Sequence, residues 1–453
     1  MVDSVPATPT NAAPKPLAGA LLTRRMLLGR AALSVAAAGA ASLLAGCAVA
    51  GSSAGASARP TAPPVKLTYL HQWSPTQGHG PITNTLAARF RQLNPSIDIQ
   101  PVYAANYYQK LTTVLAGGDW PDVVTYNLAF LPELIVTKAV VAAEDLAKGQ
   151  YRYDQNDLVA GAREQATFNG KLMAMPYVLN NSGLAYNQTL YKRVGLDPAK
   201  PPTTWDELVA QAQRLTNHTG AAPVWGTVFP KGTADPISPL LAFIWQNGGD
   251  IMDATNTTPR WTEAPAVEAL QFQVDLVHKY NVATLPSPGG ETGNVGIWHI
   301  PPGNVSVLHT TVKNAFEWAT AVLPRQKQQA STVGGHSLAV LNTKKYEQQA
   351  WQFVQWWTQP AQNAEYLVAS TTLPPWHASA QQPAWKQGLK DEPRLQPFVD
   401  MLAYGRPTPK LVGWQQIINL LATARDDAAA LKKSPLEALN AAALAAAPLI
   451  KQG

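Results

Sequence analysis

The sequence predicts an α/β fold whose central sheet is mainly parallel. The segment 65–70 alternates apolar and polar residues as a half-buried strand does, and two further short segments are read as strands. The two segments between these strands repeat apolar residues at helical spacing. The strands are predicted over 65–70, 97–102 and 121–126, and the helices over 82–93 and 107–116. Strands that alternate with helices across short turns typically form a parallel sheet with helices on its faces.

Local signals end both of these helices. The first helix places Ile82, Leu86 and Phe90 on one face, and Pro95 prevents its continuation because proline lacks the backbone N–H that a helix interior needs. The pair Gly117-Gly118 ends the second helix, as glycine commonly does just past a helix.

Later elements follow the same kind of pattern. Leu172–Pro176 and Gly183–Asn187 are predicted to be two strand pieces on either side of 178–182. Thr204 is predicted to cap the helix that follows it, with Glu207 at capping-box distance. A short strand is predicted over 338–341, and further helices over 205–215, 268–280, 346–358, 414–430 and 435–450.

Composition excludes several function classes. The chain has 453 residues and one cysteine, Cys47, so it can form no internal disulfide or cysteine–metal cluster. Its eight histidines lack metal-ligand spacing, and no metal or cofactor is expected. No basic stripe with interleaved aromatic residues is present, which argues against nucleic acid. Fourteen tryptophans in a chain with only 14 % charged residues favour a polar, weakly charged ligand, although tryptophan also fills cores.

The first 46 residues are predicted to be an export signal. The pair Arg24-Arg25 precedes an apolar segment, 31–46, that ends in small residues before Cys47. This ending resembles the lipobox of bacterial lipoproteins, and the arginine pair resembles twin-arginine signals. A plain membrane anchor is the alternative, but the segment is shorter than the roughly 20 residues that span a bilayer. We expect a lipid on Cys47 and a flexible tether over 47–64, rich in Ala, Gly, Ser and Pro.

Many segments of the chain occur in an order and spacing that resemble one family. They are Phe90–Ile99, Tyr107–Leu111, Ala116–Val123, Asn169–Tyr177, Leu184–Asn187, Pro201–Leu208, Trp245–Asp250, Thr332–Ser337, Ala350–Val354 and Leu373-Pro374. Together they are similar to the extracellular solute-binding proteins of ABC importers, family 1, the carbohydrate-binding group that includes maltose and glycerol-phosphate receptors. The resemblance extends over nearly all of 65–450.

The resemblance implies a two-lobed periplasmic-binding-protein-like fold of type II, with the ligand in a cleft that closes between the lobes. Lobe one would comprise 65–179 and 337–388, and lobe two 183–334 and 395–453. The protein would be a monomer without catalytic activity, held at the extracytoplasmic face of the cell membrane, that delivers a carbohydrate or polar sugar derivative to the permease subunits. The segment 301–312 departs from the family pattern, so the identity of the ligand does not transfer.

A general rule selects the first candidate ligand-binding residues. In open α/β sheets, ligands lie beyond the carboxyl ends of strands, at the switch point of the topology. This rule selects Gln72 and Trp73 after the first strand and Asn127 after the third. Trp73 could stack on a sugar ring or could cover the edge of the core. Tyr107 and Tyr108 are neighbours, so only one of them is expected to face the cleft.

Further candidates lie at the predicted crossings between the lobes and in lobe two. Asn180 and Asn181 offer amide groups for sugar hydroxyls, or serve the turn itself. Asp235 and Trp245 are candidates whose structural alternatives are a helix cap and a core position. The remaining candidates are Gly335 and His336, whose backbone N–H groups lie at a crossing, Trp376 in a loop, and Arg406 and Trp414 in a segment that closes over ligands in relatives. The planar guanidinium of Arg406 could donate to vicinal hydroxyls or to a phosphate. The structural alternative is a surface arginine in a proline-rich turn.

Three other functions are compatible with parts of the sequence. Gly335–Ala339 resembles the nucleophile elbow of α/β-hydrolases, but a strand is predicted after Ser337, where the elbow needs a helix. A glycosidase would need two carboxylates in the cleft, and acidic residues are sparse. A receptor that reports to a sensor kinase stays open, because it would use the same closed cleft.

Overall fold

The computed structural model describes residues 63–76, 78–148, 153–219, 222–228, 237–285 and 288–451. The predicted export signal, Cys47, most of the predicted tether and Asp235 lie outside these residues. Within the described ranges, none of the helices combines the length and the apolar character needed to cross a membrane.

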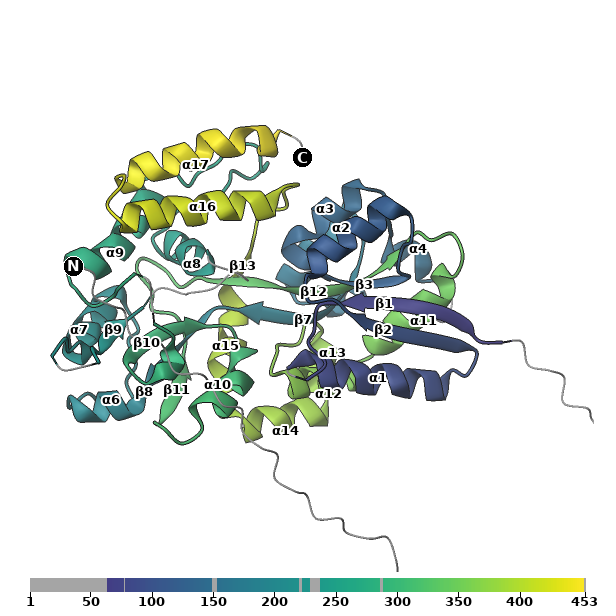
Figure 1. The fold of residues 1–453 in the computed structure, drawn as a ribbon, viewed down its shortest axis with the longest axis horizontal. Helices are drawn as coiled ribbons and strands as arrows, with labels where there is room; N and C mark the ends of the chain where they lie inside the picture. The colour runs from purple at the N-terminus through teal and green to yellow at the C-terminus, as the bar shows by residue number, and fades with distance from the viewer. Residues whose placement is uncertain are drawn as a thin grey trace, which may run out of the picture. The chain divides into compact units, whose positions relative to one another are not determined.

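The first sheet begins with three parallel strands, as predicted. These are β1 (Val65–His71), β2 (Ile97–Tyr103) and β3 (Val123–Asn127), in the order β2-β1-β3. Helix α1 (His79–Leu93) joins β1 to β2, and α2 (Tyr107–Gly117) joins β2 to β3. Figure 1 shows α1 on one side of this sheet and α2 on the other.

Two long antiparallel strands extend the first sheet, and here the expected lengths were wrong. β12 spans Ser331–Leu341 instead of 338–341, and β7 spans Met175–Asn181 instead of ending at 176. Glycine, serine and asparagine lower the strand propensity of these segments. They are nevertheless strands because β12 lies between neighbours on both edges: β7 on one, and β13 (Gly405–Pro407) followed by β3 on the other.

The second sheet has the order β11-β8-β10-β9. Its strands are β8 (Gly183–Asn187), β9 (Trp225–Thr227), β10 (Val295–Ile300) and β11 (Trp318–Ala321). Ser182 alone separates β8 from β7, so the chain passes directly from one sheet to the other. A second passage occurs where the loop after β11 enters β12, whose Ser331 hydroxyl donates to the carbonyl oxygen of Ser182 at 2.8 Å.

Helices cover both sheets, close to the expected bounds. α7 (Trp205–Leu215) begins as predicted: the Thr204 side chain accepts a hydrogen bond from the backbone N–H of Glu207. α16 (Trp414–Ala429) and α17 (Pro435–Ile450) agree within one residue and lie side by side with α9 (Ala264–His278) (Figure 1). α8 (Ser238–Gln246) is buried at every residue, and α11 (Glu347–Trp357) carries the fully buried Trp351 and Trp357.

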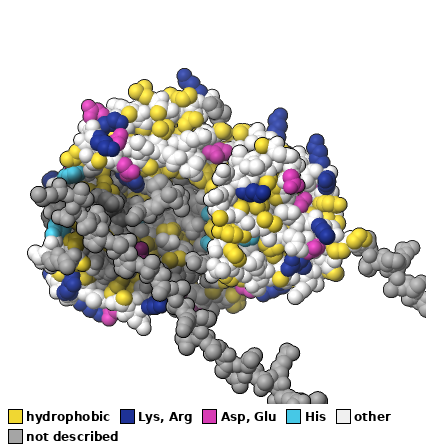
Figure 2. All heavy atoms as spheres, viewed as in Figure 1, with side chains coloured by type: hydrophobic (Ala, Val, Ile, Leu, Met, Phe, Trp, Pro, Cys, Tyr) yellow, Lys and Arg dark blue, Asp and Glu magenta, His cyan; other side chains and the backbone are white. Residues whose placement is uncertain are grey.

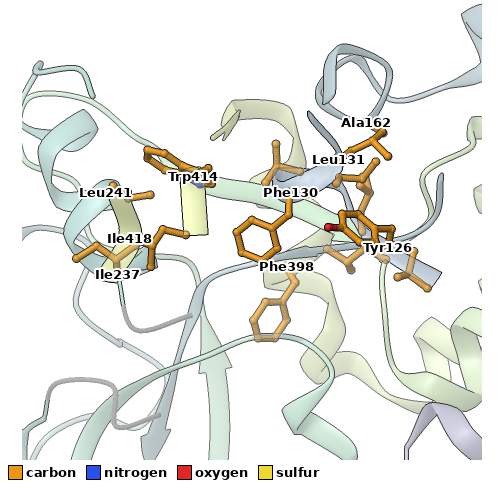
Figure 3. Close-up of a cluster of buried hydrophobic side chains, with 14 of the residues drawn as sticks. Tyr126, Phe130, Leu131, Ala162, Ile237, Leu241, Phe398, Trp414 and Ile418 are labelled. Atoms are coloured by element: carbon orange, nitrogen blue, oxygen red, sulfur yellow. The ribbon is translucent and has the colours of Figure 1, made fainter. Parts of the chain in front are cut away.

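The shorter elements are α3 (Leu131–Val136), β4 (Val140–Val141), α4 (Ala143–Leu146), α5 (Ala160–Ala166), β5 (Thr167–Phe168), β6 (Lys171–Leu172), α6 (Gln188–Arg193), α10 (Asn304–Val312), α12 (Pro360–Ser370), α13 (His377–Gln381), α14 (Pro383–Asp391) and α15 (Gln396–Asp400). One continuous hydrophobic core includes residues of both sheets. Figure 3 shows Tyr126 and Phe130, at the end of β3, in the same buried cluster as Ile418 of α16 and Leu241 of α8.

Candidate functional site

The topology of the first sheet has its switch point between β1 and β3. From β1 the chain leads through α1 to β2, and from β2 through α2 to β3 on the other side of β1. The chain therefore leaves the adjacent carboxyl ends of β1 and β3 in opposite directions. Open α/β sheets bind ligands at such a point, beyond the carboxyl ends of the strands. His71 and Asn127 are the last residues of these two strands.

A break in the strand pairing of β12 lies next to these strand ends, on the side of β12 that faces β13 and β3. β13 pairs with β12 only as far as Val333, and β3 pairs with β12 from His336, so Gly334 and Gly335 have no strand beside them on that edge. A Cβ atom placed on Gly334 would have no heavy atom within 4 Å, which shows open space at this residue. On the other edge, Gly334 lies opposite Asn180 of β7.

The structure brings several of the predicted residues together here. The Gln72 amide donates to Nε2 of His336 at 2.8 Å, since an amide nitrogen cannot accept. His336 in turn lies opposite Asn127 in the register of β12 and β3. Gln72, His336 and Asn127 are thus neighbours at the carboxyl ends of β1 and β3, and Gly335 precedes His336 in β12. Asn180 lies on the opposite side of β12, across from Gly334.

Trp73 is held in one orientation by three aromatic neighbours. Its indole N–H donates to the Tyr177 hydroxyl at 2.9 Å, and its ring stacks on His79 with centroids 4.0 Å apart. The edge of His336 approaches the same indole at 4.8 Å. Nδ1 of His79 is hydrogen-bonded to the Tyr366 hydroxyl at 2.9 Å, so the stacking partner is itself fixed. A half-buried, immobilised indole is a suitable platform for a sugar ring.

The histidines around Trp73 are neutral. Burial lowers the pKa of His71 and of His79 to about 4, and lowers that of His336 to about 3 with a contribution from His79. Nδ1 of His71 accepts the backbone N–H of Trp73 at 3.2 Å, which requires that nitrogen to be unprotonated. This part of the site therefore offers rings and hydrogen-bonding groups without positive charge.

The two neighbouring tyrosines divide as expected. Tyr107 is buried, and its hydroxyl donates to the carbonyl oxygen of Thr125. Tyr108 is 37 % exposed and packs edge-on against Tyr126 and Phe130 beyond the end of β3. We therefore assign Tyr107 to the core and keep Tyr108 as a candidate.

Three other candidates lie in the packed interior, which corrects the expectation that they present a ligand-binding surface. Trp414 is 0 % exposed and lies beside Leu241 and Ile418 (Figure 3), because the first turn of α16 enters the core. The Asn181 amide donates to the carbonyl oxygen of Phe398 at 2.7 Å and so ties β7 to α15. The Trp376 indole donates to the carbonyl oxygen of Pro176 at 2.7 Å.

Trp376 borders a separate cavity of about 270 Å³. Tyr153, Asp157, Met175 and Gln359 also line this cavity. Both carboxylate oxygens of Asp157 accept the backbone N–H of Ala378, at the start of α13, and so serve the fold.

Arg406 and Trp245, predicted separately, lie together in the structure. The Arg406 guanidinium lies over the Trp245 ring, 5.0 Å from its centroid, and Nη2 contacts Oδ2 of Asp250 at 2.8 Å. Oδ1 of Asp250 accepts the Trp245 indole N–H at 3.1 Å. Trp245 is buried, as its core alternative requires, while Arg406 stays partly exposed.

Sequence reasoning missed four residues of the site. His71, His79, Tyr177 and Tyr366 form the mount of Trp73. Tyr177 and Tyr366 are distant from Trp73 in sequence, and no motif marks the nearby His71 and His79 as its partners. Tyr103 could have been found: it ends β2, is 42 % exposed, and lies 6.4 Å from His71 between ring centroids. The strand-end rule applies to it as it does to Gln72.

The structural context of Ser337 differs from that of a hydrolase nucleophile. Ser337 lies within β12, is fully buried, and donates its hydroxyl to the carbonyl oxygen of Tyr126 at 3.2 Å. A nucleophile elbow needs an exposed serine on a turn between a strand and a helix. Among the described residues, no group of three or more His, Cys, Asp or Glu side chains is arranged to hold a metal ion.

The arrangement defines a class of protein: a two-lobed α/β protein whose chain passes repeatedly between two sheets, with polar and aromatic side chains at the switch point. Residues 73–364 match the family described as bacterial extracellular solute-binding protein. The chain belongs to this family.

Relatives with curated names agree with the assignment. The sn-glycerol-3-phosphate-binding periplasmic protein of Yersinia pestis is 24 % identical over 335 residues, which cover 68 % of this chain and 74 % of the relative. The protein of that name from Salmonella typhi is 31 % identical over 157 residues, covering 33 % and 36 % of the two chains.

Solved structures share the fold. The cyclic α-maltosyl-1,6-maltose-binding protein of Arthrobacter globiformis has a TM-score of 0.75 at 25 % identity, with 86 % of this chain and 100 % of that chain covered. UgpB from Mycobacterium tuberculosis, solved with glycerophosphocholine, has a TM-score of 0.75 at 20 % identity and coverages of 86 % and 99 %. The two-lobed α/β fold predicted from the sequence is thereby confirmed.

Proposed function

We propose that this protein is the substrate receptor of an ABC importer and that it captures a carbohydrate or polar sugar derivative between its lobes. The observation that carries the proposal is the mounted Trp73 beside Gln72 and His336, at the switch point of the first sheet, in a chain of the solute-binding family. An aromatic face flanked by amide and imidazole groups matches the alternating apolar and hydroxylated surfaces of a sugar.

The proposal names the parts that would contact the ligand. Lobe one contributes Gln72, Trp73, Tyr108 and Asn127. The crossing segments contribute Asn180, His336 and the backbone at Gly335, and lobe two contributes Arg406 and the backbone at Gly334. Asp235 keeps its place as a sequence-based candidate. The lobe bounds of 65–179 with 337–388, and 183–334 with 395–453, are part of the same proposal, as is a monomeric receptor that docks its closed form on the permease.

A ligand screen tests this function. Calorimetry with maltose, cyclic α-maltosyl-1,6-maltose, sn-glycerol 3-phosphate and glycerophosphocholine should reveal reversible binding of at least one compound, with the compound unchanged afterwards. Closure of the lobes on the ligand should lower the radius of gyration in solution scattering. Conversion of a compound into a product, with no reversible ligand, would instead support an enzyme.

Replacement of Trp73 by alanine is expected to weaken the binding of the screened ligand at least tenfold. The stacking surface is lost, and a tenfold change corresponds to about 1.4 kcal/mol, within what a buried aromatic contact contributes. Titration calorimetry measures the affinity. Tyr346→Ala is the control, because Tyr346 is an exposed aromatic residue just beyond β12, at the end of the sheet opposite the site. Equal affinities of the two variants would remove Trp73 from the site.

The lipid anchor is also proposed. Cys47, which lies outside the described residues, follows the small residues Ala45 and Gly46 as a lipidated cysteine does. Cys47→Ser is expected to release the protein from the membrane fraction while its ligand affinity stays unchanged, because the fold begins near Val65. Fractionation of expressing cells with detection by antibody measures this. A Cys47→Ser protein that stays with the membrane would show that another segment anchors it.

A further inference from the structure

Arg406 is a cation whose charge is already partly cancelled by a neighbour. Its Nη2 contacts Oδ2 of Asp250 at 2.8 Å, and the two side chains are 38 % and 34 % exposed. Asp250 is itself held by two more hydrogen bonds to Oδ1, from the Trp245 indole at 3.1 Å and from the backbone N–H of Ile251 at 2.8 Å. The carboxylate therefore stays in place beside Arg406.

The same contacts orient the guanidinium. Cζ of Arg406 lies over the buried Trp245 ring, 5.0 Å from its centroid, and only Nη2 has a hydrogen-bond partner within the described ranges. Arginine has five N–H donors in a rigid fork, so among the described residues the donors on Nε and Nη1 are left for paired oxygen atoms. Vicinal hydroxyls and phosphate oxygens both present such pairs.

The position of Arg406 relates this pair to the candidate site. Arg406 lies opposite Thr332 in the register of β13 and β12. Two residues further along β12 is Gly334, where the space is open. The backbone of Arg406 therefore lies within two residues, along β12, of the open space at Gly334.

We propose that Asp250 is a specificity-determining residue that sets the site for uncharged, hydroxyl-rich ligands by offsetting the charge of Arg406. This inference rests on the proposed function, which places Arg406 beside the ligand. A phosphate ester would interact favourably with Arg406 and unfavourably with Asp250, so its net attraction is small. A sugar hydroxyl is uncharged, so Asp250 does not repel it, and it can accept hydrogen bonds from Nε and Nη1 of Arg406. Specificity then arises from repulsion of the wrong ligand as much as from attraction of the right one.

Asp250→Asn tests the proposal with little change of shape. The asparagine carbonyl oxygen can still accept the hydrogen bonds of Trp245 and Ile251, while the negative charge is removed. We expect the variant to bind sn-glycerol 3-phosphate at least tenfold more tightly than the wild type does, and its affinity for maltose to change by less than threefold. Calorimetry measures both affinities, and inorganic phosphate should raise the melting temperature of the variant more than that of the wild type.

Two further variants complete the design. In Asp250→Asn/Arg406→Gln the gain for phosphate compounds should disappear, because it depends on the released charge of Arg406. Glu263→Gln is the matched control: it removes one carboxylate from the same lobe, paired with Arg260 at 2.9 Å, and should leave the affinity for sn-glycerol 3-phosphate unchanged. If Asp250→Asn does not fold, Asp250→Ser keeps a smaller acceptor and receives the same measurements.

The outcomes separate the two proposals. A gain for phosphate compounds that requires Arg406 supports the role of Asp250. The inference is overturned if wild type and Asp250→Asn bind sn-glycerol 3-phosphate equally, or if the gain persists without Arg406. If maltose and the other sugars fail to bind the wild type, the carbohydrate part of the proposed function fails, while the response of the variants to phosphate still decides the role of Asp250.

Discussion

Lowering the pH from 7.5 to 5 is expected to reduce the free energy of unfolding by several kcal/mol. Four histidines are responsible: burial lowers the pKa of His71, His79 and His299 to about 4 and that of His336 to about 3. In the unfolded chain their pKa is about 6.5. Below pH 6.5 the unfolded chain therefore binds protons that the folded protein does not bind until the pH approaches 4.

The sign and size of the effect follow from this difference. The stabilisation that each neutral, buried histidine contributes to the free energy of unfolding is fully present above pH 6.5. It falls as the pH drops towards the pKa of the folded state. At pH 5 each group costs about 2 kcal/mol relative to neutral pH, so the four together approach the total stability of a typical domain. Protonation would also break contacts of the site, since Nδ1 of His71 accepts the backbone N–H of Trp73.

Guanidinium unfolding at pH 7.5, 6 and 5 measures this dependence. His299→Phe serves as the diagnostic variant, because Nδ1 of His299 is buried without a partner among the described residues and the ring contacts Phe243. The variant should lose about a quarter of the pH dependence. A free energy of unfolding that stays constant from pH 7.5 to 5 would contradict neutral, buried histidines.

Gly335→Ala is expected to destabilise the protein by about 3 kcal/mol or more, the upper range for overpacking. A Cβ atom at this position would lie 2.0 Å from the carbonyl oxygen of Val178 in β7. That contact is with backbone, so either β7 or β12 must move, and the pairing between them includes an irregularity between His336 and Ser337. The two strands carry the chain between the sheets, so the strain falls on the site itself.

The adjacent glycine provides the matched control. Gly334→Ala places its methyl group in open space, and its effect on stability should stay within about 1 kcal/mol. Because that space borders the candidate site, the same substitution should reduce ligand affinity. Thermal and guanidinium unfolding of both variants, with calorimetry for Gly334→Ala, measure the contrast. Equal stabilities for the two variants would contradict the close approach of β12 and β7 at Gly335.

Local signals were sufficient for most helices and for the first three strands. Pro95 follows α1 closely, Gly117-Gly118 ends α2, and the Thr204 cap begins α7, because each acts on neighbouring backbone groups. The lengths of β7 and β12 could not be read in the same way. Gly334, Gly335 and Ser337 have weak strand propensity and become strand residues only because neighbouring strands pair with them.

The candidate site, too, was predicted in part from local sequence signals and in part only from the tertiary structure. The strand-end rule selected Gln72, Trp73 and Asn127 from the sequence, because the order of strands and helices implies where strands end. It could not show that Tyr177 fixes Trp73 or that Trp414 is core, since those contacts join distant segments. The stacking of the nearby His79 on Trp73 depends on side-chain packing, which the rule does not address. Figure 2 shows hydrophobic side chains scattered over the visible surface of lobe one, so surface character alone does not mark the site.

The sequence by itself determined the α/β class and the family, and it predicted which end of the sheet binds a ligand, because propensity, capping and motif order are local properties of the chain. Only the tertiary structure decided which candidates share a site. In the tertiary structure Asp250 pairs with Arg406, and the space at Gly334 is open. Burial there lowers the pKa of the histidines, so that they are neutral at pH 7. Each of these depends on desolvation and on contacts between residues far apart in the chain, which no local pattern encodes.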